Sequence, residues 1–555
     1  MVPSGGSLRK AAIVSAALAL AAVASQLFLV ACTSVDVPLL DDWDTLVGFL
    51  VYWQDEADFR GRLRQLFDPH NEHLLAVPRL ALLGVHGLTG HIDFAWLNLI
   101  GNLLVLVLLG ALWCEFRRDA PAAERAIGFL PAVLFTVQPQ AWTTVISPTV
   151  SLSNNGVMAF GAVCFACLAR SRVAWAGLAA AAATFSQGNG IFVLPIAACV
   201  PWLQGQHRLA RRWGFVSLAA TVVYFWAAPN DYGTASPWTS LARPDRLASY
   251  ALYFVGSAGG FGRPTPSAAV GAVLVASFAW LTWRGLAQRN PALFALCVFL
   301  FASVAGNALV RAHQGADAAL FQPRYRLYGG TLLALTWLGW LEVAPRLRTR
   351  TWTATAALVS ILFWGASFHS GAAAAKAHAN ALRAGLDRWW ETGAGGLRHP
   401  DFRKANFFLT RALHDGLLRI PDDWPERYGE RPRASGPPPG PGAAVVWKLN
   451  AVHSAEGYLT VIGQARGSGS ALGQRVEIAL VRDNRAWFAP ARGVARGDPP
   501  TRHPPDRRLT GAGFHALVDT RDLPAGRYRL GVLVHQGEHV YFAAGESVLT
   551  IEVEP

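Results

Sequence analysis

The chain has 555 residues, of which 52% are hydrophobic and only 15% are charged, and its formal net charge is +13. A soluble domain carries roughly a quarter of its residues as charged side chains, so this composition excludes an ordinary soluble protein. Most of the excess charge is arginine in short loops between long apolar runs. This is the positive-inside pattern of membrane proteins, and no basic stripe with interleaved aromatic residues indicates nucleic-acid binding.

The sequence predicts a mainly α-helical polytopic membrane protein with a C-terminal β-sandwich. Apolar runs of roughly 20 residues can cross a bilayer core of about 30 Å, and about eleven such spans are expected in the first 373 residues. The predicted spans are 11–33, 92–114, 127–147, 152–170, 173–186, 190–204, 213–229, 267–285, 290–310, 325–343 and 352–373. The arginine-rich loops assign one side to the cytoplasm, which leaves the long first loop, 35–91, on the external side.

Two stretches are expected to depart from simple spans. Residues 173–204 carry a polar break, SQGNG, in the middle, and predict two short helices that do not cross as ordinary spans. Residues 247–262 are apolar, but counting them as a span would reverse every later loop. We therefore expect them to form a helix that lies on, or dips into, the external face.

The pattern changes after residue 373, and three further parts are predicted on the external side. Residues 374–432 are expected to form soluble helices, and 433–444 form a Pro/Gly-rich linker. Residues 445–555 alternate between apolar and polar positions in short stretches separated by turn residues, which is typical of a β-sandwich.

Three aspartates, Asp41, Asp42 and Asp44, follow the first apolar run in the sequence VPLLDDWD. Carboxylates at the edge of a membrane are unfavourable unless they are solvated, paired or lining a cavity. Such acids can act as a general base, bind a divalent metal or hydrogen-bond sugar hydroxyls. A solvated loop start with a helix cap is the alternative interpretation.

A second polar cluster, His70, Asn71, Glu72 and His73, precedes the next apolar run. If this segment is helical, the two histidines share one helix face. Their spacing differs from the zinc-protease pattern, which places the histidines four residues apart. Arg79 follows and could hold an anionic group or pair with Glu72. An ordinary charge-rich turn is the alternative.

Two more polar positions are expected on the same external side. Gln187 and Asn189 occupy the break between the short helices, and irregular backbone at membrane depth is tolerated only where it is buried in protein or lines a cavity. Arg311, His313 and Gln314 precede a late span that opens with Arg324 and Tyr325, where arginine can bind a lipid phosphate and tyrosine lies at the headgroup level. Interfacial anchoring is the alternative.

These features together resemble the GT-C superfamily of integral membrane glycosyltransferases. The motifs DDW, PHNEH, SQGNG and PRY resemble a group of poorly characterised bacterial members over roughly residues 11–373. Those members usually read NEHR, whereas Leu74 follows His73 in this chain.

The resemblance implies an inverting glycosyltransferase that takes a sugar from a polyprenyl phosphate or diphosphate carrier. It implies transfer to a glycan or lipid acceptor at the periplasmic face of the bacterial inner membrane. Asp42 is the implied catalytic base or acceptor-orienting acid, with Asp41 as the second candidate. The implied substrate-binding residues are Asp44, His70, Asn71, Glu72, His73, Arg79, Gln187, Asn189, Arg324 and Tyr325. Arg324, with Arg79, would neutralise the phosphate leaving group.

The cofactor and two other functions stay open. Some members of the superfamily use a divalent metal, Mg or Mn, and Asp41, Asp42 and Glu72 are the candidate ligands. A transporter or flippase of a lipid-linked or anionic substrate is one alternative function, because broken helices with polar residues suit transporters. A non-catalytic scaffold is the other, and its glycan-binding sandwich would expose an aromatic platform. Its candidates are Trp447, Trp487 and Tyr541, for which a place in the core is the alternative.

Overall fold

The computed structural model divides into two compact units, each of which is built from several segments of the chain. The first unit comprises Met1–Ser34, Arg60–Leu82 and Phe94–Ala379, and the second comprises Val35–Phe59, Leu83–Asp93 and Asn380–Pro555. The structure describes residues 5–71, 73–227, 237–393, 395–421, 423–438, 445–455, 457–467, 474–494, 513–537 and 539–551.

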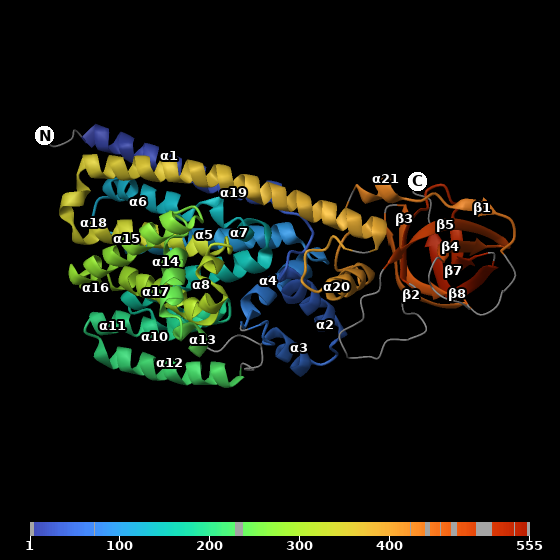
Figure 1. Ribbon diagram of the computed structural model, residues 1–555, viewed down its shortest axis with the longest axis horizontal. Coiled ribbons are helices and arrows are strands. Elements are labelled where there is room, and N and C mark those ends of the chain that lie inside the picture. The colour runs from blue at the N-terminus through green and yellow to red at the C-terminus, as the bar shows by residue number, and fades with distance from the viewer. Residues whose placement is uncertain are drawn as a thin grey trace. The chain divides into compact units, whose positions relative to one another are not determined.

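The first unit is helical (Figure 1). Its helices are α1 (Gly5–Thr33), α5 (Phe94–Glu115), α6 (Ala122–Thr136), α7 (Thr143–Ile146), α8 (Pro148–Ala169), α9 (Val173–Thr184), α10 (Val193–Ala197), α11 (Cys199–Leu203), α12 (His207–Ala227), α13 (Pro237–Leu241), α14 (Pro244–Gly256), α15 (Pro264–Trp283), α16 (Leu286–Arg289), α17 (Pro291–Arg311) and α18 (Tyr325–Val343). Short 3-10 turns are η2 (Pro139–Ala141), η3 (Gly188–Phe192), η4 (Ala312–Gln314), η5 (Ala316–Ala319) and η6 (Pro345–Arg348). Helices α3 (Phe59–Leu66), α4 (Ala76–Thr89) and α19 (Arg350–Thr392) contain residues of both units.

Within the described part of the chain, six helices are long and apolar enough to cross a membrane. They are α1 from Leu8, α5, α8, α15, α17 extended to Gln314, and α19. The expectation of a multi-pass helical membrane protein is therefore confirmed. Proline or asparagine defines several of these starts. Asn290, for example, accepts a hydrogen bond from the Leu293 N–H at 3.1 Å, and Pro291 occupies the first helical position of α17.

The ends of two predicted spans, 127–147 and 352–373, differ clearly from those in the structure. The span predicted at 127–147 is wrong in its second half, because α6 ends at Thr136. Gln138 then precedes Pro139, is extended, and accepts a hydrogen bond from the Gln140 N–H with its own side chain. The change of pattern expected at residue 373 is not a helix end, since α19 continues to Thr392 through an alanine-rich stretch with high helix propensity.

The apolar stretch predicted to lie on or dip into the external face is a helix packed inside the unit. Tyr250 and Phe254 of α14 are buried in the main hydrophobic cluster. A Cβ atom added to Gly256 would come within 1.9 Å of the Ser267 carbonyl oxygen on α15. The absence of side chains at this crossing lets the two backbones touch, as small residues do between membrane helices.

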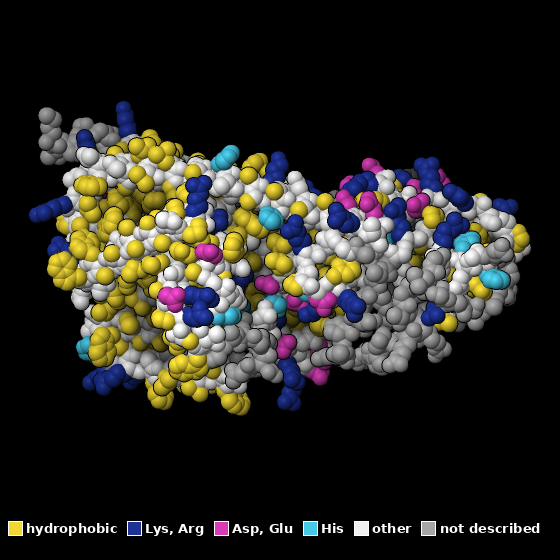
Figure 2. All heavy atoms as spheres, viewed as in Figure 1, with side chains coloured by type: hydrophobic (Ala, Val, Ile, Leu, Met, Phe, Trp, Pro, Cys, Tyr) yellow, Lys and Arg dark blue, Asp and Glu magenta, His cyan; other side chains and the backbone are white. Residues whose placement is uncertain are grey.

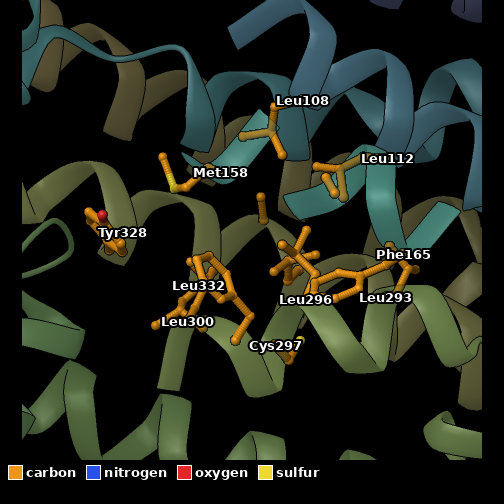
Figure 3. Packing of buried hydrophobic residues seen from close by; sticks show 14 of the residues in the cluster. Leu108, Leu112, Met158, Phe165, Leu293, Leu296, Cys297, Leu300, Tyr328 and Leu332 are labelled. Atoms are coloured by element: carbon orange, nitrogen blue, oxygen red, sulfur yellow. The ribbon is translucent and has the colours of Figure 1, made fainter. Parts of the chain in front are cut away.

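One continuous hydrophobic cluster joins α5, α8, α17 and α18 (Figure 3). Figure 3 shows these residues pointing toward one another: Leu108 and Leu112 of α5, Met158 and Phe165 of α8, Leu293, Leu296, Cys297 and Leu300 of α17, and Tyr328 and Leu332 of α18. All of them are buried. In Figure 1, α1 lies beside α6 and the first part of α19, and Ala22, Leu130 and Trp364 pack together there.

The first unit has apolar side chains on its surface as well as in its core. Figure 2 shows hydrophobic side chains across this surface. Phe215, Val222 and Trp226 of α12 are exposed, as are Leu358 and Leu362 of α19. A soluble protein would bury such side chains, so this face is suited to lipid.

The second unit combines short helices with antiparallel strands. Its elements are η1 (Trp43–Gly48), α2 (Phe49–Asp55), α20 (Phe402–His414), α21 (Trp424–Tyr428), β1 (Arg433–Ser435), β2 (Val446–Ala455), β3 (Tyr458–Arg466), β4 (Arg475–Arg482), β5 (Arg485–Val494), β6 (Gly513–Asp519), β7 (Gly526–Gln536) and β8 (His539–Ile551). The neighbour order is β2-β3-β6-β5-β4-β7-β8, with β1 also paired to β5. Every strand pair is antiparallel.

The sheet is folded across a single core. Strand β5 pairs with β4 over residues 485–491 and with β6 over 492–494, so it passes from one half of the sheet to the other. Val461 of β3, Phe514 of β6 and Val532 of β7 are all buried in one cluster. A C-terminal antiparallel sheet domain of sandwich-like form is therefore confirmed.

The three aromatic residues considered as a glycan platform contact this core. Trp447, Trp487 and Tyr541 are half-buried and pack against the same cluster. Trp487 also lies edge-on to Tyr528, with ring centroids 5.4 Å apart. Their contacts are those of residues at the border of the core, on the end strands β2 and β8 and on the inner strand β5.

Candidate functional site

The first unit contains a cavity of about 250 Å³ whose wall brings together side chains from distant parts of the sequence. Five of the predicted site residues line it: His73, Gln187, Asn189, Arg324 and Tyr325. They come from the turn before α4, from η3, and from the start of α18. Sequence segments more than 100 residues apart thus meet in one place.

The η3 turn carries Gln187 and Asn189 into the cavity because it folds tightly back on the end of α9. A Cβ atom at Gly190 would lie 1.9 Å from the Ala183 carbonyl oxygen, so only glycine permits this approach. The predicted polar break between two short helices is therefore present. Pro195 follows η3 within α10.

The floor of the cavity is a chain of hydrogen bonds centred on Asn189. Its Nδ2 donates to Ser303 Oγ at 3.0 Å and to the Tyr328 hydroxyl at 3.1 Å. The Tyr328 hydroxyl in turn donates to Asn154 Oδ1 at 3.3 Å. Among the described residues, Asn189 Oδ1 is buried and accepts no hydrogen bond. It is therefore an acceptor open to a hydroxyl or amide of a bound molecule.

Two arginines give one side of the wall its positive charge. Arg311 ends α17, and Arg324 immediately precedes α18. The guanidinium carbon of Arg324 lies 5.8 Å from the centroid of the Tyr325 ring, and that ring stacks on Phe254 with centroids 4.1 Å apart. An aromatic stack in a cavity that two arginines line suits an anion attached to an apolar group.

The histidine cluster is a tight turn, and not the helix considered from its spacing. The His70 N–H donates to the His73 carbonyl and the His73 N–H to the His70 carbonyl, both at 2.9 Å. Asn71 takes a left-handed conformation, with φ of 49°, which asparagine tolerates better than most residues. Glu72 lies outside the described residues. The turn places His73 in the cavity wall, and the Asn71 side chain contacts the His70 ring at 3.1 Å.

Arg79 has a different position from the one expected. It is buried, and its Nη1 donates to the backbone carbonyls of Gln65 at 3.0 Å, of Leu66 at 3.1 Å, and of Asp68. These carbonyls lie at the C-terminal end of α3 and in the turn after it, where the helix itself supplies no N–H donors. These contacts give Arg79 a positioning role for the first loop.

The acidic segment lies in the second unit and begins with a rare conformation. Residues 43–48 form the π-helix η1, and π-turns occur frequently at functional sites. Asp42 is fully buried, and its Oδ2 accepts the Leu39 N–H at 3.1 Å. Asp41 is half-buried, and its carbonyl accepts the Thr45 N–H at 2.9 Å. Both acids are thus held by the turn that opens η1.

Asp44 is part of an ion-pair cluster with α20. Its Oδ2 contacts His399 Nε2 at 3.0 Å, and its Oδ1 contacts Lys404 Nζ. Burial alone would raise the pKa of Asp44, but the hydrogen bonds from His399 and Lys404 outweigh it and lower the pKa to about 2. Burial opposes protonation of His399, yet its hydrogen bond to Asp44 raises the His399 pKa. Asp44 therefore stays ionised, and its contacts with His399 and Lys404 connect η1 to α20.

The predicted metal ligands do not form a recognisable centre within the described ranges. In those ranges, no group of three or more His, Cys, Asp or Glu side chains could hold a metal ion. Asp41 and Asp42 are adjacent in sequence, and the third candidate, Glu72, falls outside the described residues. Metal use by this chain stays a prediction.

Sequence reasoning missed several residues of the cavity. They are Asn154 of α8, Ser303 and Asn307 of α17, and Tyr328 of α18. The signal available was a polar residue inside an apolar span, since such residues tend to face the bundle interior or a cavity. Asn307 accepts the Tyr250 hydroxyl at 2.6 Å, which holds its amide at the cavity wall.

No protein-family model, no curated protein and no solved structure matches the chain.

Proposed function

We propose that this chain is an inverting membrane glycosyltransferase of the GT-C type that uses a sugar linked to a polyprenyl phosphate. The observation that carries the proposal is the cavity of the first unit. It joins two arginines, Arg311 and Arg324, to amide and hydroxyl groups and to an aromatic wall. A phosphate with a sugar on one side and an isoprenoid chain on the other requires those three kinds of surface.

In this proposal each group of the wall has a separate task. Arg324 and Arg311 bind the phosphate and stabilise the negative charge that grows on its bridging oxygen as the bond to the sugar breaks. Asn189 and Gln187 hydrogen-bond the sugar hydroxyls. The aromatic side chains, including Phe254, contact the isoprenoid next to the phosphate.

The transfer itself is a single displacement. The oxygen of an acceptor hydroxyl attacks the anomeric carbon, the bond between that carbon and the phosphate oxygen breaks, and the configuration inverts. The hydroxyl proton passes to a carboxylate, and the resemblance to the GT-C superfamily makes Asp42 the first candidate for this base and Asp41 the second. The carrier phosphate leaves with the electron pair. His73 and the turn around it orient the donor.

The proposal also includes the finer topology. The first 373 residues would cross the inner membrane of a bacterium about eleven times, with the shorter helices and α18 adding to the six long spans. The C-terminal sandwich would then lie in the periplasm, close to the glycan or lipid acceptors of the cell envelope. Protease accessibility of the sheet domain in intact and permeabilised spheroplasts tests this orientation.

The first test replaces Asp42 by asparagine in the full chain. Because the asparagine side chain keeps an oxygen that can accept the Leu39 N–H, the local fold should survive. Transfer of a radiolabelled sugar from the polyprenyl carrier should fall roughly 10²–10⁴-fold, as expected for loss of a general base. The matched control is Asp317→Asn at an exposed position. Wild-type transfer by purified Asp42→Asn protein would remove this acid from the mechanism.

The second test replaces Arg324 by glutamine. Loss of a charged hydrogen bond to phosphate should raise the KM for the lipid-linked donor roughly 10- to 100-fold, because such bonds contribute about 1.5–3 kcal/mol. Arg263→Gln, which removes an exposed arginine, is the control. An unchanged KM would exclude Arg324 from carrier binding. Cell-envelope glycans compared with and without the protein would identify the acceptor.

The transporter alternative requires a polar path from the cavity through the unit. Leu293, Leu296, Leu300 and Val304 of α17 are buried in the hydrophobic cluster below it, as Figure 3 shows for the three leucines. This packing favours a cavity that binds from one side. Uptake of a fluorescent lipid-linked sugar across vesicles containing the purified chain would favour the transporter instead.

A further inference from the structure

A second cavity in the first unit, of about 710 Å³, has arginines as its main charged groups. Four guanidinium side chains line it: Arg117, Arg118, Arg289 and Arg348. They come from the loop after α5, from the end of α16, and from η6. The cavity of about 250 Å³ described above, which is called the donor cavity from here on, does not explain this cluster, because none of these residues lines it.

The two cavities lie at opposite ends of the same two helices. Asn290 and Pro291, at the start of α17, line the arginine cavity, and Arg311, at its end, lines the donor cavity. Helix α18 runs the other way, from Tyr325 at the donor cavity to Glu342 at the arginine cavity. At 1.5 Å per residue, Pro291 and Arg311 lie about 30 Å apart along α17, which is about the thickness of a bilayer core.

Two of the arginines are fixed in place by the end of α18. Arg348 donates from Nε to the Leu341 carbonyl at 2.8 Å and from Nη2 to the Glu342 carbonyl at 3.1 Å. Arg289 Nη1 donates to the same Glu342 carbonyl at 3.2 Å. Cations are favourable at a helix C-terminus, so these side chains are held in position without any ligand.

Three carboxylates line the cavity, Glu115, Asp119 and Glu342, and two of them are engaged by neighbouring groups. Glu115 is buried and pairs with Arg118 and, at 3.0 Å, with Arg170. The Glu342 carboxylate accepts the Arg117 backbone N–H at 2.8 Å and Asn290 Nδ2 at 3.1 Å. These acids therefore fix the loops that carry the arginines.

Some guanidinium donors of the wall have no partner in the part of the chain that the structure describes. The Arg117 side chain uses Nη2 toward Glu124 at 3.2 Å, and no bond engages its Nη1. Arg289 likewise leaves Nη2 without an acceptor. Burial and then the neighbouring Arg117 lower the pKa of Arg348, so the arginines repel one another. A bound anion would relieve this repulsion and accept the open donors.

We propose that this arginine-lined cavity, at the end of the helical unit opposite the donor cavity, binds a phosphate group. Guanidinium groups grip phosphate with two parallel hydrogen bonds, and the side chains of Arg117 and Arg289 supply open N–H groups for this purpose. The phosphate can be that of a soluble anion or that of an anionic lipid headgroup, because both present the same oxygen atoms.

The experiment uses the full chain in nanodiscs of phosphatidylcholine and measures thermal unfolding. One arm adds inorganic phosphate, with sodium chloride at equal ionic strength as the reference. The other arm replaces part of the phosphatidylcholine by phosphatidylglycerol. Binding to the folded state alone raises Tm with ligand concentration, so one arm should show a saturable increase. The arm that responds identifies the source of the phosphate.

Variants connect the response to the cavity. Arg117→Gln removes only an ion pair with the partly exposed Glu124, so the chain should fold, and its apparent affinity should fall at least tenfold. Arg289→Gln should have the same effect. If that variant does not fold, the affinity of Arg117→Gln alone tests the proposal. The matched control is Arg211→Gln on the exposed start of α12, which should respond as the wild type does. The proposal is overturned if the wild type responds in neither arm, or if Arg211→Gln loses as much affinity as Arg117→Gln.

Discussion

The contact of Asp44 with His399 and Lys404 makes a quantitative prediction about α20. The Asp44 pKa of about 2, compared with the ordinary value of 3.8, corresponds to about 2 kcal/mol of interaction that favours the ionised carboxylate. The Asp44 side chain is only 16% exposed, so little of this is screened by solvent. The Asp44→Asn variant loses this charge. The locally unfolded state of α20 should therefore be about 30-fold more populated at neutral pH.

The pH dependence follows from the two directions of shift. The Asp44 pKa is lowered on folding, so its contribution is present above pH 3.8 and disappears as the pH falls through about 2. The His399 pKa is raised above 6.5, so its contribution is present below pH 6.5 and disappears as the pH rises through the raised value. The contact should therefore be strongest between about pH 4 and 6.5.

Hydrogen exchange of the amides in residues 402–414 measures this opening directly in the full chain. Exchange in the Asp44→Asn variant should be about 30-fold faster at constant pH, with exchange in helix α8 of the first unit unchanged. Asp423→Asn is the control, because that carboxylate is 60% exposed in its pair with Arg427 and should change exchange little. If α20 exchanges at the wild-type rate in Asp44→Asn, the ion pair does not hold the helix.

Three further predictions concern single positions. Gly190→Ala should destabilise the first unit by about 2 kcal/mol or more, seen as a lower Tm in detergent, whereas Gly177→Ala, where a Cβ meets nothing within 4 Å, should be neutral or stabilising. Arg79→Gln should speed hydrogen exchange in residues 59–68, because the carbonyls that Arg79 satisfies lose their donor, and unchanged exchange would contradict this role. Burial lowers the pKa of His515 to about 4, so the sheet domain should lose stability as the pH falls from 6.5 to 4. His515→Gln should remove that pH dependence, and a pH profile like that of the wild type would disprove it.

Much of the helical unit follows from hydropathy. The sequence predicts a helix over 325–343, and α18 has those bounds, because an apolar run between Pro323 and the arginines of η6 leaves little choice of ends. The error at 127–147 comes from counting apolar residues across Pro139, where the chain leaves the helix. Hydropathy measures transfer to lipid, and it is insensitive to a single residue that ends a helix.

The candidate site is only partly predictable for a different reason. Gln187, Asn189 and Arg324 are polar residues at breaks or ends of apolar runs, where sequence reasoning can recognise them. Ser303 is a weakly polar residue within the apolar run of α17, and its role depends on the rotation of that helix. The Asp44–His399 contact joins residues 355 positions apart, and no local pattern connects them.

The direction of the acidic side chains depends on the number of residues in the π-helix at 43–48. Its wide turn holds one residue more than an α-helical turn, so deletion of one residue would let the chain continue into α2 as a plain α-helix. Each residue advances an α-helix by about 100°. That deletion would therefore rotate Asp41 and Asp42 by about 100° around the axis of α2. A chain shortened by one residue after this motif would keep the sequence DDWD, but Asp41 and Asp42 would point in a different direction.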